Sequence, residues 1–575
     1  MSYLAPVTEQ DFVLEHVAGL SALAAAPRFA HATPDVVSAI LEGAAALAER
    51  KLAPLNLSGD RAGLRWSPEG VAMPEGFAAA YSAYVDGGWG SLAVPEAFGG
   101  QGLPFVLAAA LLEDIGSANM AFSLIAMLTG GAIEALAAHG SPSLRETWLP
   151  RLVSGAWNGA MDITEPQAGS DVGAIHTRAM AQPDGSYRIK GGKIFITFGE
   201  HDLTDNIVHL VLARTPGAPS GTRGLSLFLV PKFRLDVDGA PGERNDVRCV
   251  SIEHKLGIHA CPTCTMAFGD QDDCTGHIVG EEGGGMKAMF TMMNIARLSV
   301  GLEGVSVAER ATQAALTYAA QRVQSARVGD PARTPVAIID HPDVRRMLFR
   351  MRGLTQGARA LVYYAAGQLD RAHLGDAAAK ARLELLTPVA KAYASDIGCE
   401  VASVGIQVHG GMGFVEETGA AQYYRDARIA PIYEGANGIQ AADLVMRKLP
   451  MNSGAPITDL LAEMRSDAVD EPTLMALLEA VEQVVVQFRG ADPDDRLAGS
   501  YPLLTMLAVG VSGWQLHRQA QIAAKSDGDP AFLAMKRAVV RFHLDTIVPE
   551  ATGLLAAALA GKRLLYGLSA AELAA

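Results

Sequence analysis

One block of short apolar runs between much longer helical patterns is the feature of this 575-residue chain that most constrains its fold. Between about residues 160 and 281 the apolar runs shorten and turn signals multiply, among them Pro183-Asp184-Gly185. On either side, apolar residues recur with helical spacing over longer stretches. The sequence therefore predicts an α+β protein, mainly α, in which a central β domain interrupts helical domains.

The predicted helices and strands divide the chain into four domains. We place an N-terminal helical domain at residues 1–159, the β domain at 160–281, a four-helix-type bundle at 282–450 and a C-terminal helical extension at 451–575. Helices are predicted at 34–50, 106–115, 118–138, 144–153, 286–324, 343–371, 376–408, 435–448, 457–464, 473–488, 530–543 and 551–575. Strands are predicted at 187–190, 194–198, 207–214, 225–230, 247–254 and 265–268.

Composition and charge narrow the class of protein. Hydrophobic residues make up 49% and charged residues 19% of the chain, which excludes a disordered protein. The formal net charge of −15 disfavours a nucleic-acid partner. An anionic ligand would have to meet local positive groups.

The start of the chain and the cysteines indicate a cytoplasmic protein. Glu9 and Asp11 interrupt any apolar core of a secretory signal, and the apolar stretch at 118–138 is interpreted as a buried helix. The five cysteines form no disulfide framework. Cys261 and Cys264 form a CxxC pair, but no second pair follows, so thiols on strands are favoured over a zinc site.

The segment from Pro431 to Gln440 carries the clearest chemical signal. It places Glu434 between an apolar run and Gly435. A carboxylate in such a setting is desolvated, which raises its pKa, and the glycine leaves room for a ligand to approach the backbone. A carboxylate of this kind suits proton abstraction from carbon. The alternative is a loop glutamate before a helix, as most glutamates in such positions are.

Two segments of the β domain have weaker signals on their own. The segment 161–171 (MDITEPQAGSD) joins a strand-like start to a turn of small residues. Its backbone N–H groups and the hydroxyls of Thr164 and Ser170 suit a cofactor's polar edge or a phosphate. The segment 193–197 (KIFIT) is an apolar strand that ends in a hydroxyl.

Taken in order, the motifs resemble those of the acyl-CoA dehydrogenase family. These motifs are T-E-P-x-A-G-S-D, I-K-G-x-K-x-aromatic-I-T, Q-x-x-G-G-x-G-F and I-Y-E-G, and the resemblance covers residues 40–449. The segments 253–259 and 341–347 and the C-terminal extension resemble a bacterial branch of the family. The resemblance implies a flavin enzyme that dehydrogenates an acyl-CoA thioester to a trans-2-enoyl-CoA, with 3-methylmercaptopropionyl-CoA or a similar acyl-CoA as substrate.

The resemblance also implies where FAD would bind, between the β domain and the bundle. The backbone of Ile163 and the side chain of Thr164 would meet the polar edge of the flavin ring, and Arg322 would meet the pyrophosphate. Gln407, Gly410 and Gly411 match a loop that contacts FAD of the neighbouring subunit. The full predicted cofactor set is Ile163, Thr164, Gly169, Phe195, Thr197, Arg322, Gln407, Gly410, Gly411, Ala436 and Asn437. Phe195 stands where many members have Trp, Ala436 where Thr is frequent, and Ser325 where Phe is usual.

By the same resemblance, Glu434 is the catalytic base that removes the α-proton, while the β-hydrogen leaves as hydride to the flavin. The predicted substrate-binding residues are Ser170, Asn294, Arg297 and Gly435. An Asp is common in relatives at the Asn294 position. Some relatives carry the base just before the Arg297 position, but here that residue is Ala296, which cannot accept a proton.

Several alternatives stay open at this stage. An acyl-CoA oxidase would share the half-reaction and pass its electrons to oxygen, and a flavin-free scaffold would keep only the fold. The resemblance favours an electron-transferring flavoprotein as acceptor and a homodimer. The extension would pack on the core or stand in for a second dimer of a tetramer. A membrane-surface role is the other possibility, which the negative charge disfavours, and no stable membrane insertion is expected.

Overall fold

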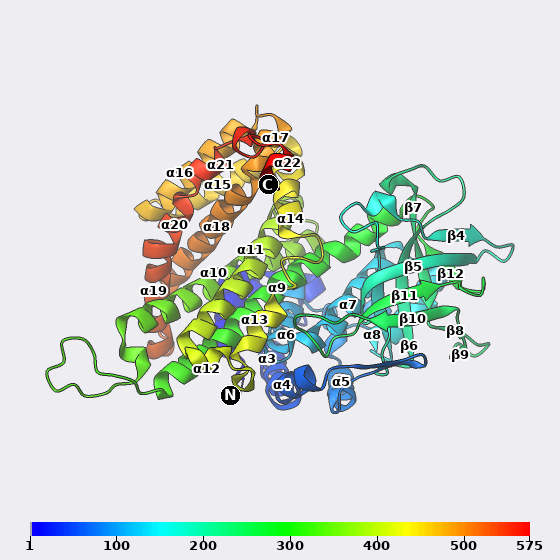
Figure 1. Cartoon of the computed structure of the whole chain (residues 1–575), viewed down its shortest axis with the longest axis horizontal. Coiled ribbons are helices and arrows are strands. Elements are labelled where there is room, and N and C mark those ends of the chain that lie inside the picture. Colours follow the sequence, from blue (N-terminus) through cyan, green and yellow to red (C-terminus); the bar gives the residue numbers. More distant parts are fainter. Residues whose placement is uncertain (1–2) are drawn as a thin grey trace. The chain divides into compact units, whose positions relative to one another are not determined.

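The computed structural model describes residues 3–575, which form two compact units. The β unit comprises residues 3–5 and Phe29–Ala296, and the helical unit comprises Pro6–Arg28 and Arg297–Ala575. The boundary between them falls inside the long helix α9 (Gly285–Gln321) (Figure 1). Each unit is described by itself.

The β unit contains helices followed by a mixed sheet. Its helices are α3 (Pro34–Leu47), α4 (Ala53–Ala62), α5 (Phe77–Asp86), α6 (Phe105–Ala118), α7 (Met120–His139) and α8 (Pro142–Val153). Its strands are β1 (Arg65–Ser67), β2 (Gly70–Ala72), β3 (Trp157–Asp162), β4 (Arg178–Ala181), β5 (Tyr187–Thr197), β6 (Asn206–Arg214), β7 (Leu225–Pro231), β8 (Phe233–Leu235), β9 (Pro241–Arg244), β10 (Val247–Ile252), β11 (Thr263–Phe268) and β12 (Thr275–Val279).

Eight of these strands form the main sheet. Its order is β10-β11-β5-β12-β7-β6-β3, and β4 pairs with β5 and β6. The pairs β3–β6 and β4–β6 are parallel and the others antiparallel. Helix α7 packs directly on β3, because a Cβ on Gly159 would lie 2.4 Å from the Cβ of Ala132. Only glycine allows this close approach.

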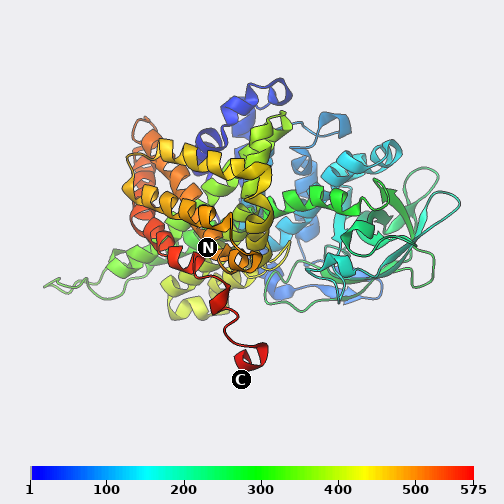
Figure 2. The same cartoon turned by 90° about the horizontal axis from the view of Figure 1, so that it is seen from above.

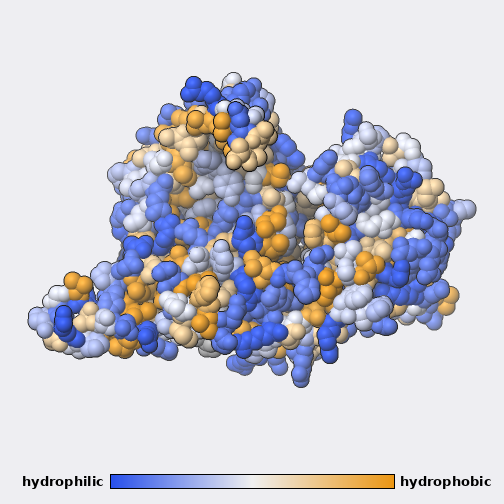
Figure 3. Space-filling view, in the orientation of Figure 1, coloured by the Kyte–Doolittle hydropathy of each residue, from blue (hydrophilic) through white to orange (hydrophobic). Residues whose placement is uncertain are grey.

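Helix α7 is the one helix among residues 3–575 that is long and apolar enough to cross a membrane. Within the protein, 78% of its most apolar window is buried. This burial agrees with the core helix that the sequence predicts for 118–138. The face of the protein shown in Figure 3 is largely hydrophilic, with apolar residues scattered over it.

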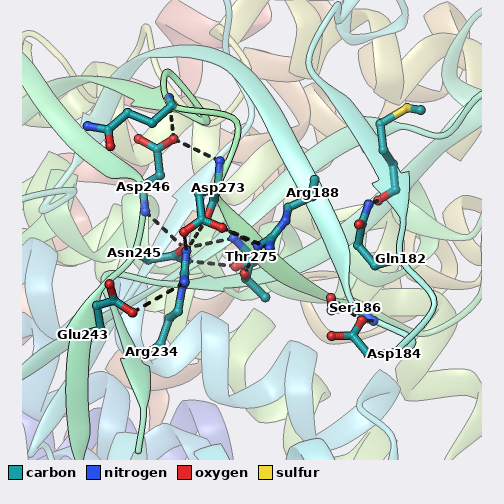
Figure 4. Close-up of polar contacts among 12 residues, drawn as sticks. Gln182, Asp184, Ser186, Arg188, Arg234, Glu243, Asn245, Asp246, Asp273 and Thr275 are labelled. Carbon is teal, nitrogen blue, oxygen red and sulfur yellow. Dashed lines mark hydrogen bonds and ion pairs between the residues drawn. The ribbon is translucent and has the colours of Figure 1, made fainter.

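A polar network connects the β8–β9 hairpin to strands of the main sheet (Figure 4). Nη2 of Arg234 lies 2.6 Å from Oδ2 of Asp273, and Nη2 of Arg188 lies 3.0 Å from its Oδ1. Nδ2 of Asn245 donates to the carbonyls of Pro231 and Thr275 at 2.9 and 2.8 Å. The β8–β9 hairpin is thereby fixed to β5, β7 and β12.

The helical unit is a bundle of long helices with an extension packed on it. Besides α9 from Arg297 onward, it contains α1 (Val7–Val13), α2 (Leu20–Ala24), α10 (Pro342–His373), α11 (Ala377–His409), α12 (Gly411–Phe414), α13 (Ala420–Ala427), α14 (Asn437–Asp443), α15 (Ala455–Asp467), α16 (Pro472–Phe488), α17 (Pro493–Ala498), α18 (Ser500–Ala523), α19 (Pro530–Phe542), α20 (Val548–Thr552), α21 (Leu555–Ala558) and α22 (Ala570–Leu573). The extension helix α18 packs against α10, α11 and α14. Figure 2 shows the last residues, in red, leading away from the packed helices.

Buried charges join the first helix of the chain to the extension. Nζ of Lys536 on α19 donates to Glu9 on α1, and both side chains are almost entirely buried. Arg359 on α10 lies 3.8 Å from the same carboxylate and 2.7 Å from Glu309 on α9. Such a network is stable only while each charge keeps its partner.

The predicted elements need four corrections. The predicted strands 187–190 and 194–198 are one strand, β5, because Gly191 and Gly192 pair with β11 instead of forming a turn. The helix predicted from 435 begins at Asn437, since Gly435 has a left-handed φ of +87°. The Ala-rich end, predicted as one helix over 551–575, is broken into short pieces, with glycines at 553, 561 and 567. Only the end of β3 was indicated, as the strand-like start at 161. The elements not predicted at all are the 24-residue helix α18, helices α1, α2, α4, α5, α12, α13 and α17, and strands β1, β2, β4, β8, β9 and β12.

Candidate active site

Glu434 lies in a loop between α13 and α14 whose backbone is unusual. Its φ is +54°, a left-handed value that is rare outside glycine. The next residue, Gly435, has φ +87°, and a Cβ there would lie 2.5 Å from Nε2 of Gln440. The left-handed conformation therefore favours glycine, and a Cβ there would displace the Gln440 amide. Backbone strain of this kind persists only where surrounding groups hold it.

Three side chains hold the carbonyls of this loop. Nζ of Lys391 on α11 donates to the carbonyl oxygen of Gly435 at 3.0 Å. Nε2 of Gln440 donates to the carbonyls of Glu434 and Gly435 at 3.3 and 3.0 Å. Nε of Arg297 on α9 donates to the carbonyl of Glu434 at 3.4 Å. Helices α9, α11 and α14 thus fix the position of Glu434 together.

Asn437 connects this loop more deeply to α11. Its Oδ1 accepts from Nζ of Lys391 at 2.9 Å, and its Nδ2 donates to Oδ1 of Asp396 at 2.9 Å. Asp396 in turn accepts a hydrogen bond from the hydroxyl of Tyr501 on α18. The side chain that sequence analysis assigned to the cofactor is therefore part of a buried hydrogen-bond network.

The charges around the loop set the protonation of Glu434. Burial raises the pKa of Glu434 to about 7, against the lowering effect of the nearby Arg297 and Lys391 cations. Burial also lowers the pKa of Lys391 to about 8, against the raising effect of Glu434 and Glu303. A carboxyl group that titrates near neutrality can accept a proton and release it again.

Glu303 is a buried carboxyl group next to the loop. It lies on α9 and accepts a hydrogen bond from the hydroxyl of Tyr433, the residue before Glu434. Burial raises the pKa of Glu303 to about 8, and the charge of Glu434 adds to that rise. Sequence reasoning missed Glu303 and Lys391. The signal for Lys391 was a lone cation within the apolar run 385–394 of a predicted helix.

The turn at Ile163 and Thr164 in the β unit is held by a buried ion pair. Nζ of Lys193 on β5 lies 2.9 Å from the carbonyl oxygen of Ile163 and 2.8 Å from Oε1 of Glu165. The backbone N–H of Ile194 donates to the carbonyl of Thr164 at 2.9 Å. The turn and the strand are therefore one rigid piece.

Glu165 is ionised at neutral pH. Burial alone would raise its pKa, but the Lys193 ammonium and hydrogen bonds from Thr177 and His176 lower the pKa to about 2. Phe195, further along β5, also has a left-handed φ, of +61°, and its side chain is 59% exposed. Thr197 is half-buried at the end of β5, and Gly169 and Ser170 are exposed on the turn. The predicted cofactor and substrate residues of the β unit, apart from Asn294, thus lie on β5 and on the turn that it holds.

Other predicted residues lie at a distant end of the helical unit. Tyr318 on α9 stacks on His409 at the end of α11, with ring centroids 4.6 Å apart. This contact brings the segment of Arg322 close to that of Gln407, Gly410 and Gly411. Arg322 lies beyond the end of α9, about 28 Å along the helical rise from Glu303. The structure therefore does not place these four residues beside Glu434 of the same chain.

Two predicted substrate residues are neighbours on α9. Asn294 is exposed and stands three residues before Arg297, which is buried. Burial lowers the pKa of Arg297, against the raising effect of Asp443 and Glu434. Arg297 therefore supplies a cation close to the Glu434 loop. Because the protein is acidic overall, an anionic ligand needs local positive charge of this kind.

A cavity of about 330 Å³ opens beside the loop in the helical unit. It is lined by residues of α11, α13, the loop, the start of α14 and α18: Asp396, Cys399, Tyr424, Arg428, Pro431, Ile432, Ala436, Asn437, Gly438 and Tyr501. The exposed Arg428 supplies positive charge and the tyrosines supply flat apolar surface. Such a lining suits an aromatic ligand with an anionic part.

Models of known protein families match this chain along most of its length. Models of the acyl-CoA dehydrogenase N-terminal, middle and C-terminal domains match residues 36–156, 160–271 and 283–449. A model described as acetyl-CoA dehydrogenase C-terminal like matches residues 466–569.

Individual relatives match over nearly the same length. The 3-methylmercaptopropionyl-CoA dehydrogenase of Ruegeria pomeroyi is 44% identical over 96% of this chain and 97% of its own. The broad-specificity linear acyl-CoA dehydrogenase FadE5 of Mycobacterium tuberculosis is 34% identical over 96% of both chains. The structure of Caenorhabditis elegans ACDH-11 in complex with C11-CoA shares the fold, with a TM-score of 0.78, 20% identity and coverage of 95% of this chain and 92% of that one. The chain therefore belongs to the acyl-CoA dehydrogenase family of flavin-dependent oxidoreductases.

Proposed function

We propose that this protein is an FAD-dependent acyl-CoA dehydrogenase in which Glu434 removes the α-proton of an acyl-CoA thioester, yielding a trans-2-enoyl-CoA. The observation that carries the proposal is the half-buried Glu434 side chain, whose carboxyl pKa desolvation raises to about 7, on a loop held from three helices. A base poised near the working pH combines a useful ionised fraction with sufficient basicity.

Within each unit, residues fit part of a flavin dinucleotide. In the β unit, Thr164 and the Ile163 backbone lie on the turn that Lys193 fixes, and Phe195 presents an exposed ring. In the helical unit, Ala436 and Asn437 line the cavity that also contains Arg428. Bound FAD would supply the oxidant that accepts the β-hydrogen as hydride. Gly169 and Thr197 are the remaining residues of the β unit that we propose to contact FAD.

The protein itself would supply the proton acceptor and the polarising groups. A thioester α-proton is weakly acidic, so the carbonyl needs a hydrogen-bond donor as the proton leaves. We assign this donor to the backbone N–H of Glu434, whose direction the left-handed φ sets. Arg297, Asn294, Ser170 and Gly435 would bind the substrate. The position before Arg297, where some relatives carry the base, is occupied here by Ala296, which cannot accept a proton.

We infer 3-methylmercaptopropionyl-CoA, or an acyl-CoA of similar size, as the substrate. The support is the 44% identity to the Ruegeria pomeroyi enzyme over nearly the whole of both chains. Turnover with a panel of short, medium, long and thioether acyl-CoAs tests the assignment. A preference for the thioether substrate would support it, and faster turnover of long-chain substrates would contradict it.

We also infer a cytoplasmic homodimer that passes its electrons to an electron-transferring flavoprotein. Next to Gly410 and Gly411, the side chains of Met412, Phe414 and Val415 are 49%, 86% and 40% exposed. A second copy would cover these apolar side chains while Gln407, Gly410, Gly411 and Arg322 met its FAD.

Comparing oxygen with the electron-transferring flavoprotein as electron acceptor would separate a dehydrogenase from an oxidase.

Replacing the base tests the proposed function directly. Glu434→Gln keeps the shape of the side chain but cannot accept the proton. We expect bound flavin to remain and anaerobic dye reduction to fall by about 10²–10⁴-fold, the usual contribution of a general base. Near-normal turnover by this variant would refute the assignment. The surface variant Lys525→Met, on the same unit, serves as a control and should be unaffected.

A further inference from the structure

The C-terminal extension is connected to the Glu434 loop, the loop between α13 and α14, through one side chain. Tyr501 is the second residue of α18, and its hydroxyl donates a hydrogen bond to Oδ2 of Asp396 on α11. Tyr501 also lines the cavity beside the loop. The family models place this residue in the additional C-terminal domain, at 466–569, outside the domain at 283–449 that contains Glu434.

From Asp396 the contacts continue to the loop without a gap. Oδ1 of Asp396 accepts from Nδ2 of Asn437 at 2.9 Å, and Oδ1 of Asn437 accepts from Nζ of Lys391 at 2.9 Å. The same ammonium group donates to the carbonyl of Gly435 at 3.0 Å. Four side chains thus connect α18 to the carbonyl group of Gly435, the residue that follows the proposed base.

The inner members of this network are buried, so each contact affects the next. Lys391 is fully buried and Asn437 is 4% exposed. Asn437 has further partners in Ser395 and the carbonyl of Ala392, which fix its amide in one orientation. An amide fixed in this way can hold Lys391 in only one place. Loss of the tyrosine hydroxyl would leave Oδ2 of Asp396 without this donor and free the carboxylate to turn.

We infer that Tyr501 is a positioning residue for the Glu434 loop, which acts through Asp396 and Asn437 on Lys391 and so on the Gly435–Ala436 peptide. The extension is then part of the active-site scaffold. This inference rests on the proposed role of Glu434 as the base.

Tyr501→Phe tests the inference because it removes only the hydroxyl group. We expect kcat per bound flavin to fall about tenfold, which corresponds to about 1.4 kcal/mol, as for one hydrogen bond to a charged group. KM, flavin content and melting temperature should stay close to those of the parent protein. A matched control is Tyr566→Phe, the same change at a 70% exposed tyrosine of the extension, which should leave kcat unaltered.

A double-mutant cycle then tests the route. If Tyr501 acts through Asp396, Tyr501→Phe combined with Asp396→Asn should lower kcat no further than Asp396→Asn alone. Effects that multiply would overturn the route, and an unchanged kcat in Tyr501→Phe would overturn the inference. A fall in melting temperature or flavin content with kcat per flavin unchanged would show a merely structural role and overturn it too. If Glu434→Gln also stays active, the proposed function itself fails.

Discussion

At the scale of single residues, the active site depends on where charge is buried. Glu434, Glu303 and Lys391 all lie behind or within one loop, and burial shifts the pKa of each toward neutrality. The Glu434 charge raises the pKa of Glu303 further, and the Lys391 ammonium group lowers the pKa of both carboxyl groups. The protonation of the proposed base therefore depends on a cation whose own hydrogen bonds go to Gly435 and Asn437.

This arrangement predicts the pH dependence of catalysis. The base must be ionised in the free enzyme, so kcat/KM should fall about tenfold per pH unit below a pKa of about 7. Lys391→Met removes a positive charge and so favours the protonated form of Glu434. The acid limb of the pH profile, where kcat/KM falls, should therefore move about one unit to higher pH. Kinetics between pH 5 and 9 measure both profiles.

Lys525→Met provides the comparison, because Lys525 is an exposed lysine of the same unit. Its profile should coincide with that of the parent protein. An acid limb in Lys391→Met that coincides with the parent's, or lies at lower pH, would contradict the electrostatic role of Lys391.

At the scale of elements, the turn at 163–165 and strand β5 behave as one piece because Lys193 and Glu165 are buried together. Lys193→Met would leave the Glu165 carboxylate buried without its cation. We expect the free energy of unfolding of the β unit to fall by about 3–5 kcal/mol and flavin to be lost more readily. Urea unfolding and flavin release measure the two effects.

The double variant Glu165→Gln/Lys193→Met should regain part of that stability, because no uncompensated charge remains. Lys190→Met changes the exposed lysine three positions earlier on β5, which pairs with Asp272, and should cost little. Equal losses from Lys190→Met and Lys193→Met would show that burial of the pair is not the cause.

Most of the long helices and the strands β5, β6, β7, β10 and β11 could be predicted from the sequence, because they carry clear periodicity. The prediction missed the long helix α18 and many short elements, and it misplaced element ends where one residue decides the backbone. Gly191 and Gly192 separate the two predicted strands, yet they pair with β11 inside a continuous strand. Gly435 resembles the first residue of a helix, but its left-handed conformation delays the helix to Asn437.

The candidate site was predictable only in its motif residues. Glu434 and Arg297 lie in recognisable patterns and are brought together by the fold. Glu303, Asp396 and Tyr501 were not found, because each matters through a partner that is distant in sequence. No local spacing reveals that a tyrosine at 501 meets an aspartate at 396.

At the scale of the whole chain, the helical unit is assembled from both ends of the sequence. Its stability should depend on Lys536, which pairs with Glu9 inside the protein. We expect Lys536→Met to lower the free energy of unfolding by about 3 kcal/mol, because Glu9 loses the ammonium group and Arg359 stands farther away. Chemical denaturation followed by the fluorescence of the buried Trp514 measures this change.

Adding Glu9→Gln to Lys536→Met should restore part of the loss, because the uncompensated charge is then removed. If the double variant is less stable than Lys536→Met alone, the ion pair is not the cause. Lys525→Met, at an exposed position of the same unit, should leave the denaturation midpoint unchanged.

The contact between Glu9 and Lys536 also has a consequence for protein synthesis. The two residues are 527 positions apart, and the intervening β unit is made first. At translation rates of about 5–20 residues per second, helix α1 leaves the ribosome roughly 25 to 100 s before its partner exists. During that interval the first helix waits without the extension helix against which it packs in the finished protein. We therefore expect holding chaperones to bind the nascent chain until α19 emerges.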